Sequence, residues 1–100
     1  MVAVSIMEDN EGRKRNRIAM AVYSIPDIKD YVSDVVFHAD GSFDIMFREG
    51  KGAPTAIIKE IEKRLGSIHG VRMDGIVPKT VRHNPEDVPY SIIVFLGSLE

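Results

Sequence analysis

The sequence of 100 residues predicts one α+β domain over residues 1–100, built as a two-layer sandwich. We expect a mainly antiparallel sheet with two helices on one face. Several short stretches alternate apolar and polar residues between turn residues, which is typical of hairpins. Two further stretches repeat their apolar residues every three or four positions, which is typical of amphipathic helices. A hydrophobic fraction of 44% is enough for a globular core.

The N-terminal part contains two short apolar runs that indicate a pair of strands. Val2, Val4 and Ile6 alternate with their neighbours, and residues 18–22 form the second run. Residues 9–12 between them carry a turn signal. The pattern predicts a hairpin whose loop holds a basic segment, and the alternative is a loose N-terminal arm.

A short helix is expected over residues 26–33. Ser24 followed three residues later by Asp27 fits a capping box, and Pro26 is tolerated in a first turn. Because the segment is brief, its stability must come from packing against the rest of the domain.

Residues 35–47 carry the clearest hairpin signal, Asp40-Gly41 between two alternating runs. A two-residue loop is one alternative. A three-residue loop over residues 39–41, with Gly41 left-handed, instead directs His38 and Asp44 outward. This second register gathers five large apolar side chains on one face, and burial therefore favours it. These side chains are Val35, Phe37, Phe43, Ile45 and Phe47.

The C-terminal half predicts a helix followed by two strands. An apolar stripe runs through residues 54–65, and Gly66 would cap that helix. Residues 71–82 form a strand in which Gly75 indicates a bulge and Pro78 an edge position. Residues 90–97 form a continuous apolar run, which indicates a central strand. The stripe consists of Ile57, Ile58, Ile61 and Leu65.

A ferredoxin-like core, with extra strands added to it, is compatible with this order of elements. It would run as strand, helix, hairpin, helix and strand from Ile18 to Leu96. The added strands would be the N-terminal one and the one near residues 71–82.

The densest charge run is the basic segment 13–17, which could follow a phosphate backbone. Lys51, between two glycines ahead of a helix, could add an anion contact. The predicted ligand-binding or nucleic-acid-binding residues are therefore Arg13, Lys14, Arg15, Arg17 and Lys51. The competing interpretations are a solvated hairpin tip and a simple strand-to-helix turn.

The composition narrows the function classes. The chain has no cysteine, which fits a cytoplasmic protein, and no apolar run approaches the ~20 residues of a membrane helix. A net charge of −2 lowers the expectation of a DNA-coating protein. The three histidines lack metal-ligand spacing, so we expect no metal and no cofactor; His83 with Glu86 and Asp87 is only a weak acid-base cluster.

The sequence thus favours a small non-catalytic binding module that contacts nucleic acid or a phosphate-bearing ligand. The alternative is a protein-interaction or homo-oligomerisation module that uses an exposed sheet face or an edge strand. No catalytic residues are expected, and no membrane partner.

Overall fold

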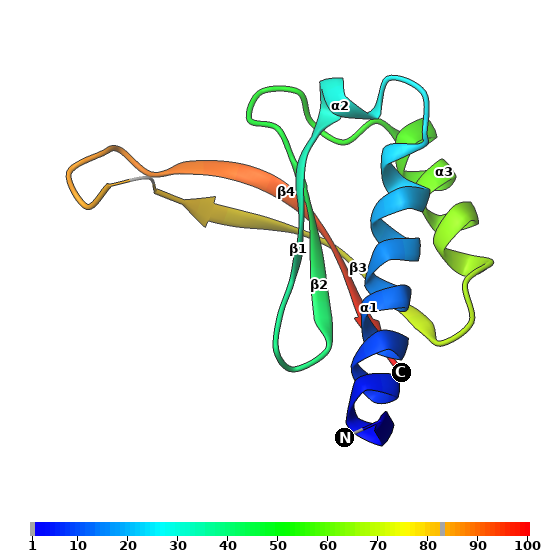
Figure 1. Cartoon of the computed structure of the whole chain (residues 1–100). Helices are drawn as coiled ribbons and strands as arrows, with labels where there is room; N and C mark the ends of the chain where they lie inside the picture. The colour runs from blue at the N-terminus through cyan, green and yellow to red at the C-terminus, as the bar shows by residue number, and fades with distance from the viewer. Residues whose placement is uncertain (1, 83) are drawn as a thin grey trace.

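The computed structural model describes the main chain of residues 2–82 and 84–100, and the side chains of residues 12–82 and 84–100. All strand pairs are antiparallel, and the strand order is β1-β2-β4-β3. Helices α1 and α3 lie together against one face of the sheet (Figure 1). The predicted two-layer α+β class is confirmed. The elements are α1 (Val2–Tyr23), α2 (Ile28–Tyr31), β1 (Val32–Phe37), β2 (Ser42–Phe47), α3 (Thr55–Gly66), β3 (Val71–Val81) and β4 (Tyr90–Leu99).

The predicted N-terminal hairpin is wrong, because Val2–Tyr23 is one continuous helix. Ile18, Val22 and Ile25 are all buried, at spacings of four and three residues, and this helical period outweighs the short apolar run. Short runs of this kind do not separate strand from helix by themselves. The first strand of the ferredoxin-like core is therefore absent, and the chain begins with a helix instead.

The predicted second helix is reduced to the single turn Ile28–Tyr31. The expected capping box is also wrong, since Asp27 makes no side-chain cap and has a left-handed main chain with φ of 63°. Ser24 donates its hydroxyl to the carbonyl of Ala21 instead. This turn carries the chain from the end of α1 into the edge strand β1.

The β1–β2 hairpin has the predicted register, with Phe37 opposite Phe43 and Val35 opposite Ile45. Its loop spans residues 39–41, and Gly41 has a φ of 90° that an L side chain rarely adopts. His38 and Asp44 consequently lie on the face away from the helices. Burial of the apolar side chains thus selected the three-residue loop.

The core lies between the helices and the inner face of the sheet. Ile61 and Leu65 of α3 are buried there, as the stripe predicted, while Ile57 and Ile58 are partly buried against it. Helix α3 ends at Gly66, and Ser67 takes the cap position with a right-handed main chain. The other fully buried side chains of this core are Ile18, Val22, Ile28, Val32, Phe43, Ile45, Phe47 and Phe95.

The two C-terminal strands are placed as the sequence predicted. β4 lies between β2 and β3, which makes it a central strand, and β3 forms an edge of the sheet. The register of β3 shifts between Met73 and Gly75, which is the expected bulge, and Gly75 has a φ of 128°. Pro78 lies in this edge strand, where a missing N–H costs least.

Candidate functional site

The β3–β4 hairpin continues well beyond the rest of the sheet. β2 accompanies β4 as far as the pair of Met46 with Val94, whereas β3 and β4 stay paired to Val81 and Tyr90. Residues 78–82 and 84–93 therefore form a two-stranded ribbon, which we call the arm. The arm projects away from both long helices (Figure 1). An isolated pair of strands is only marginally stable, so the arm is a natural place for further contacts.

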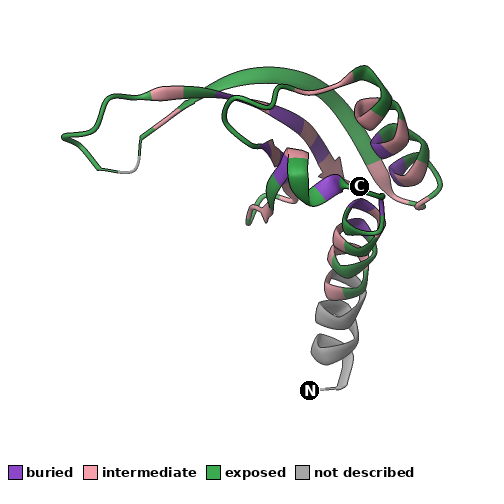
Figure 2. Cartoon of the chain, turned by 90° about the horizontal axis from the view of Figure 1, so that it is seen from above, coloured by how far each residue is buried: buried purple, intermediate pink, exposed green. Residues whose placement is uncertain are grey.

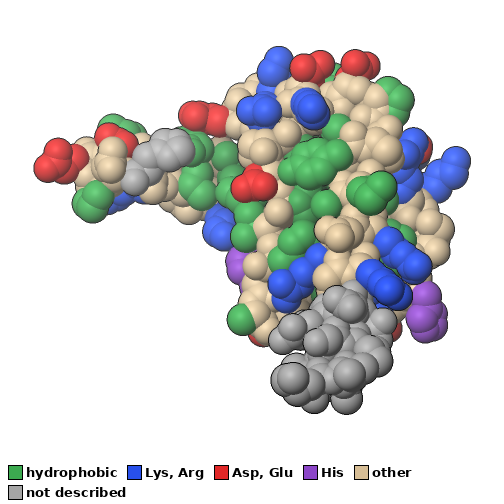
Figure 3. Space-filling model, viewed as in Figure 1, with side chains coloured by type: hydrophobic (Ala, Val, Ile, Leu, Met, Phe, Trp, Pro, Cys, Tyr) green, Lys and Arg blue, Asp and Glu red, His purple; other side chains and the backbone are tan. Residues whose placement is uncertain are grey.

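Large apolar side chains are exposed along this hairpin. The exposed fractions are 41% for Ile76, 39% for Val77 and 85% for Val88 at the tip. Figure 2 shows the ribbon exposed over most of its length. Acidic groups, Glu86 and Asp87, precede Val88 in the tip loop, and acidic side chains mark the end of the arm in Figure 3. The tip therefore presents one exposed apolar side chain beside two carboxylates.

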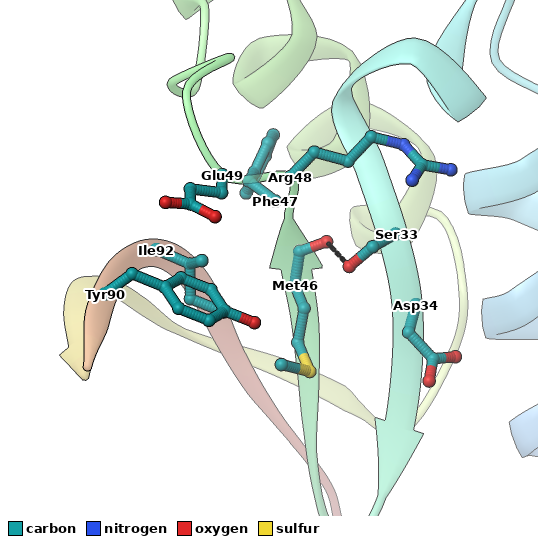
Figure 4. Close-up of a pocket in the computed structure, with 8 residues that line it drawn as sticks. All are labelled: Ser33, Asp34, Met46, Phe47, Arg48, Glu49, Tyr90 and Ile92. Atoms are coloured by element: carbon teal, nitrogen blue, oxygen red, sulfur yellow. Dashed lines mark hydrogen bonds between the residues drawn. The ribbon is translucent and has the colours of Figure 1, made fainter. Parts of the chain in front are cut away.

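A cleft opens at the root of the arm, where β2 ends and β4 continues (Figure 4). Its volume is about 560 Å³. Met46 and Ile92 contribute apolar surface, and the side chains of Tyr90 and Glu49 point toward the open space (Figure 4). Ser33 donates its hydroxyl to the carbonyl of Met46 at 3.2 Å, which ties β1 to β2 at this place. The cleft thus combines apolar and charged groups from β1, β2 and β4.

A charged cluster lies on the sheet face opposite the helices. The carboxylate of Asp44 is 3.0 Å from Nε2 of His38 and 3.6 Å from Nζ of Lys79. Asp44 is buried although its side chain leaves the core, with 7% of the residue exposed. Lys79 belongs to the arm, so this ion pair links the root of the arm to β2. The geometry explains why a carboxylate is tolerated on this face.

Two carboxylates, one exposed and one half-buried, have pKa values below their ordinary range. The pKa of Asp40 is lowered because its carboxylate accepts hydrogen bonds from the hydroxyl and the N–H of Ser42, at 2.6 and 2.9 Å. The pKa of Glu60 is lowered because Arg64 donates Nε–H to it at 2.9 Å. Asp40 therefore stabilises the β1–β2 loop, and Glu60 holds Arg64 on α3.

The five predicted cations do not form one site. Arg13 and Arg17 are exposed one turn apart on α1. Lys14 donates to the main-chain carbonyl of Glu100 at 3.2 Å. The guanidinium of Arg15 lies 5.8 Å from the centre of the Phe37 ring, and its Nε is buried without a hydrogen-bond partner among the described residues.

Lys51 lies apart from the other four. The loop after β2 is at the end of the molecule near α2, while the basic segment of α1 is in the opposite half (Figure 1). Gly50 and Gly52 both have positive φ, and the N–H of Lys51 bonds to the carbonyl of Arg48 at 3.3 Å. Pro54, which has no N–H, precedes α3 directly. The glycines therefore serve a tight turn in this structure.

A second depression lies between α1 and the end of α3, with a volume of about 420 Å³. We call it the helix groove. Met20, Ala21 and Ile68 give it an apolar floor, and Met20 is 72% exposed. Arg17 and Arg64 stand at its border, beside Ser24 and Ser67. Arg64 is bound to Glu60 and donates to the Ser24 hydroxyl at 2.7 Å.

Comparison with known proteins does not assign this chain. No family model, curated protein or solved structure matches it. Within the described residues, no three His, Asp or Glu side chains gather as a metal-binding group. No helix among those residues is long and apolar enough to cross a membrane. The predicted cluster with Glu86 and Asp87 depends on His83, which lies outside the described residues.

Sequence reasoning missed the helix groove entirely. It requires α1 to be a helix, because only then do Arg17, Met20 and Ala21 come together beside α3. The spacing of Arg17, Ala21 and Ser24 at four and three residues was the available signal.

Proposed function

We propose that the protein is a non-catalytic protein-interaction module that assembles with further copies of itself through the arm. The observation that supports this most directly is the pairing pattern. β4 loses β2 as a neighbour beyond Val94, and the ribbon continues to a tip at which Val88 is 85% exposed. Exposed apolar surface on a projecting ribbon is typical of protein contacts.

The energetics of the arm favour a binding role. Ile92 and Ile93 at the root of the arm are buried or half-buried, whereas residues 84–89 at its tip are exposed. The outer part of a two-stranded ribbon gains little from folding alone, so contact with another surface would stabilise it. The Lys79–Asp44 ion pair at its root holds the ribbon in a fixed direction, which reduces the entropy lost on binding.

The edge of the arm limits the kind of contact. Pro78 removes one main-chain donor from β3, and Lys79 places a charge on the same strand. Both features oppose open-ended edge-to-edge strand pairing. The proposal therefore assigns recognition to side chains of the arm rather than to continuation of the sheet.

Shortening the arm tests this function. Replacing residues 80–91 by Asn-Gly joins the paired residues Lys79 and Ile92 through a two-residue turn and keeps the Lys79–Asp44 ion pair. Sedimentation across a wide concentration range should show the native chain associating and the shortened chain remaining monomeric. Lys51→Ala, in an exposed loop, is the control and should associate like the native chain. A native chain that is monomeric at every concentration would refute the proposal.

A second candidate function is contact with nucleic acid or another phosphate-bearing ligand through α1. Arg13 and Arg17 favour it, because they are exposed one turn apart and have no ion-pair partner among the described side chains. Two such cations can contact neighbouring phosphates. Lys51 is too far away to join them, and Lys14 and Arg15 already have contacts.

Neutralising the pair tests this second candidate. Arg13→Gln with Arg17→Gln should weaken binding to a mixed-sequence RNA or DNA oligonucleotide, and the salt slope should fall by about 1 for each phosphate that the variant no longer neutralises. Lys51→Gln with Lys59→Gln is the matched control, since it also removes two positive charges from exposed positions elsewhere. Equal binding and equal slopes for both variants would exclude α1 as a phosphate-contacting surface.

A further inference from the structure

We infer that the tip of the arm binds in the helix groove of a second copy of this chain. This inference rests on the proposed function and names the surface that receives the arm. The tip is the loop with Glu86, Asp87 and Val88. The groove is the depression bordered by Arg17 and Arg64 over the floor of Met20, Ala21 and Ile68.

The side chains at the tip of the arm are suited to entering an apolar groove bordered by cations. Val88 is the most exposed large apolar side chain among the described residues, at 85%. The N–H of Asp87 bonds to the carbonyl of Asn84, and Arg82 donates Nη1–H to the carbonyl of Pro85 at 3.1 Å, so both contacts constrain the loop. Glu86 has no ion-pair partner among the described side chains, and Asp87 accepts one long hydrogen bond of 3.4 Å from Asn84. Both carboxylates are therefore available to cations.

The groove offers the complementary chemistry. Met20 is 72% exposed beside Ala21 and Ile68, so its floor would gain from being covered by an apolar side chain. A methionine adapts its shape to an incoming group at little cost. Arg64 is occupied by Glu60, whereas Arg17 has no ion-pair partner among the described side chains. Arg17 is therefore the cation that can accept a carboxylate from outside.

The match has to be made between two molecules. The arm leaves the sheet on the side opposite α1 and α3, and its root is fixed by pairing with β4 and by the Lys79–Asp44 ion pair (Figure 1). A chain consequently cannot place its tip in its own groove. Because the tip and the groove are different surfaces, the contact runs head to tail. Figure 3 shows acidic groups at the tip of the arm, and both basic and acidic groups on the body of the molecule.

Charge reversal on each side tests the contact in the full-length chain. Glu86→Arg faces a basic groove and Arg17→Glu meets an acidic tip, so either variant alone should associate at least about fivefold more weakly than the native chain at low salt. Mixing the two variants in equal amounts should restore association, because each tip then finds a groove of opposite charge. Asp30→Arg, which reverses a charge on the exposed turn α2 instead, is the matched control and should leave association unchanged.

The outcomes separate this inference from the function on which it rests. If shortening the arm abolishes association while neither charge reversal weakens it, the arm binds a different surface and the inference is wrong. If both reversals weaken association and the mixture stays weak, the two residues do not meet, and the inference is again wrong. A native chain that never associates refutes the proposed function itself.

Cross-linking provides a second readout that does not depend on charge. The chain has no cysteine, so the Met20→Cys and Val88→Cys variants each contain a single thiol. Mixing the two variants under mild oxidation should give a disulfide-linked heterodimer many times faster than a mixture of Val88→Cys with Lys51→Cys. Equal rates for the two mixtures would contradict the predicted contact.

Discussion

Gly97 of β4 lies directly opposite Phe43 of β2, and the Phe43 ring covers it. A Cβ at position 97 would fall 2.7 Å from Cε1 and Cε2 of that ring, far inside normal contact. Phe43 is fully buried and cannot move aside without disturbing the core. The glycine is therefore required by packing rather than by main-chain conformation.

Gly97→Ala should lower the free energy of unfolding by about 1–3 kcal/mol, the usual cost of overpacking a core. Urea denaturation measures it. Gly12→Ala in α1 is the control, because a Cβ there meets none of the described side chains or strands within 4 Å. That substitution should instead stabilise the chain by about 0.5–1 kcal/mol, since it removes a glycine from a helix. Equal effects at the two positions would contradict the contact with Phe43.

Asp40 makes the stability of the β1–β2 loop dependent on pH. Hydrogen bonds from the Ser42 hydroxyl and N–H lower its folded-state pKa below the ordinary 3.8, so the folded state prefers the charged form. This stabilisation is complete above the unfolded-state pKa and is lost as the pH falls through the lower folded-state value. The destabilising effect of Asp40→Ala should thus be largest near neutral pH and vanish in strong acid.

Urea midpoints measured across the acid range would show that convergence. Glu62→Ala, on the exposed side of α3, is a suitable control. The difference in urea midpoint between this variant and the native chain should not follow the pH dependence expected for Asp40→Ala. A constant gap between the native chain and Asp40→Ala would mean that the carboxylate of Asp40 is not the titrating group.

Single residues also show where sequence reasoning reaches its limit. The register of the β1–β2 hairpin was predictable, because a slip would have exposed five large apolar side chains. The outward direction of Asp44 followed from the same register. Its burial did not, because Lys79 comes from a strand 35 positions later in the sequence. A local pattern carries no information about such a distant partner.

At the scale of elements, α3, β3 and β4 were predictable and α1 was not. The stripe of α3 is long enough to determine its own period, whereas residues 18–22 are too few to separate a strand from a helix. The choice depends on α3, against which Ile18 and Val22 of α1 pack in the core. The helix groove could not be predicted for the same reason. Arg13 and Arg17 were predicted as cations, but the groove beside Arg17 exists only once both helices are in place.

The arm should be the least protected regular element. Residues 94–97 of β4 have strands on both sides, whereas residues 91–93 pair in the sheet with β3 alone. Amide hydrogens of the arm should therefore exchange at least about tenfold faster than those of residues 94–97 at low protein concentration. Hydrogen exchange followed by mass spectrometry resolves this difference. Uniform protection along β4 would show that the ribbon is as stable as the sheet.

At the scale of the whole molecule, the arm makes the chain elongated, with extents of 48 × 33 × 21 Å. Its radius of gyration is 14.8 Å for the Cα atoms, compared with about 13 Å for a compact chain of this length. The variant with residues 80–91 replaced by Asn-Gly should scatter as a more compact particle and keep cooperative unfolding. Small-angle scattering and circular dichroism would measure both, and loss of the folded signal would show that the body needs the arm.

The bulge at Gly75 gives the fold a means of adjusting geometry at a distance. A bulge bends its strand and increases its twist, so the direction of the arm depends on Gly75, which lies several residues before the tip. A small change in the main-chain angles at Gly75 would move the tip of the arm by a larger distance. In a chain of subunits joined end to end, one backbone angle per subunit would then decide between a closed ring and a growing fibre.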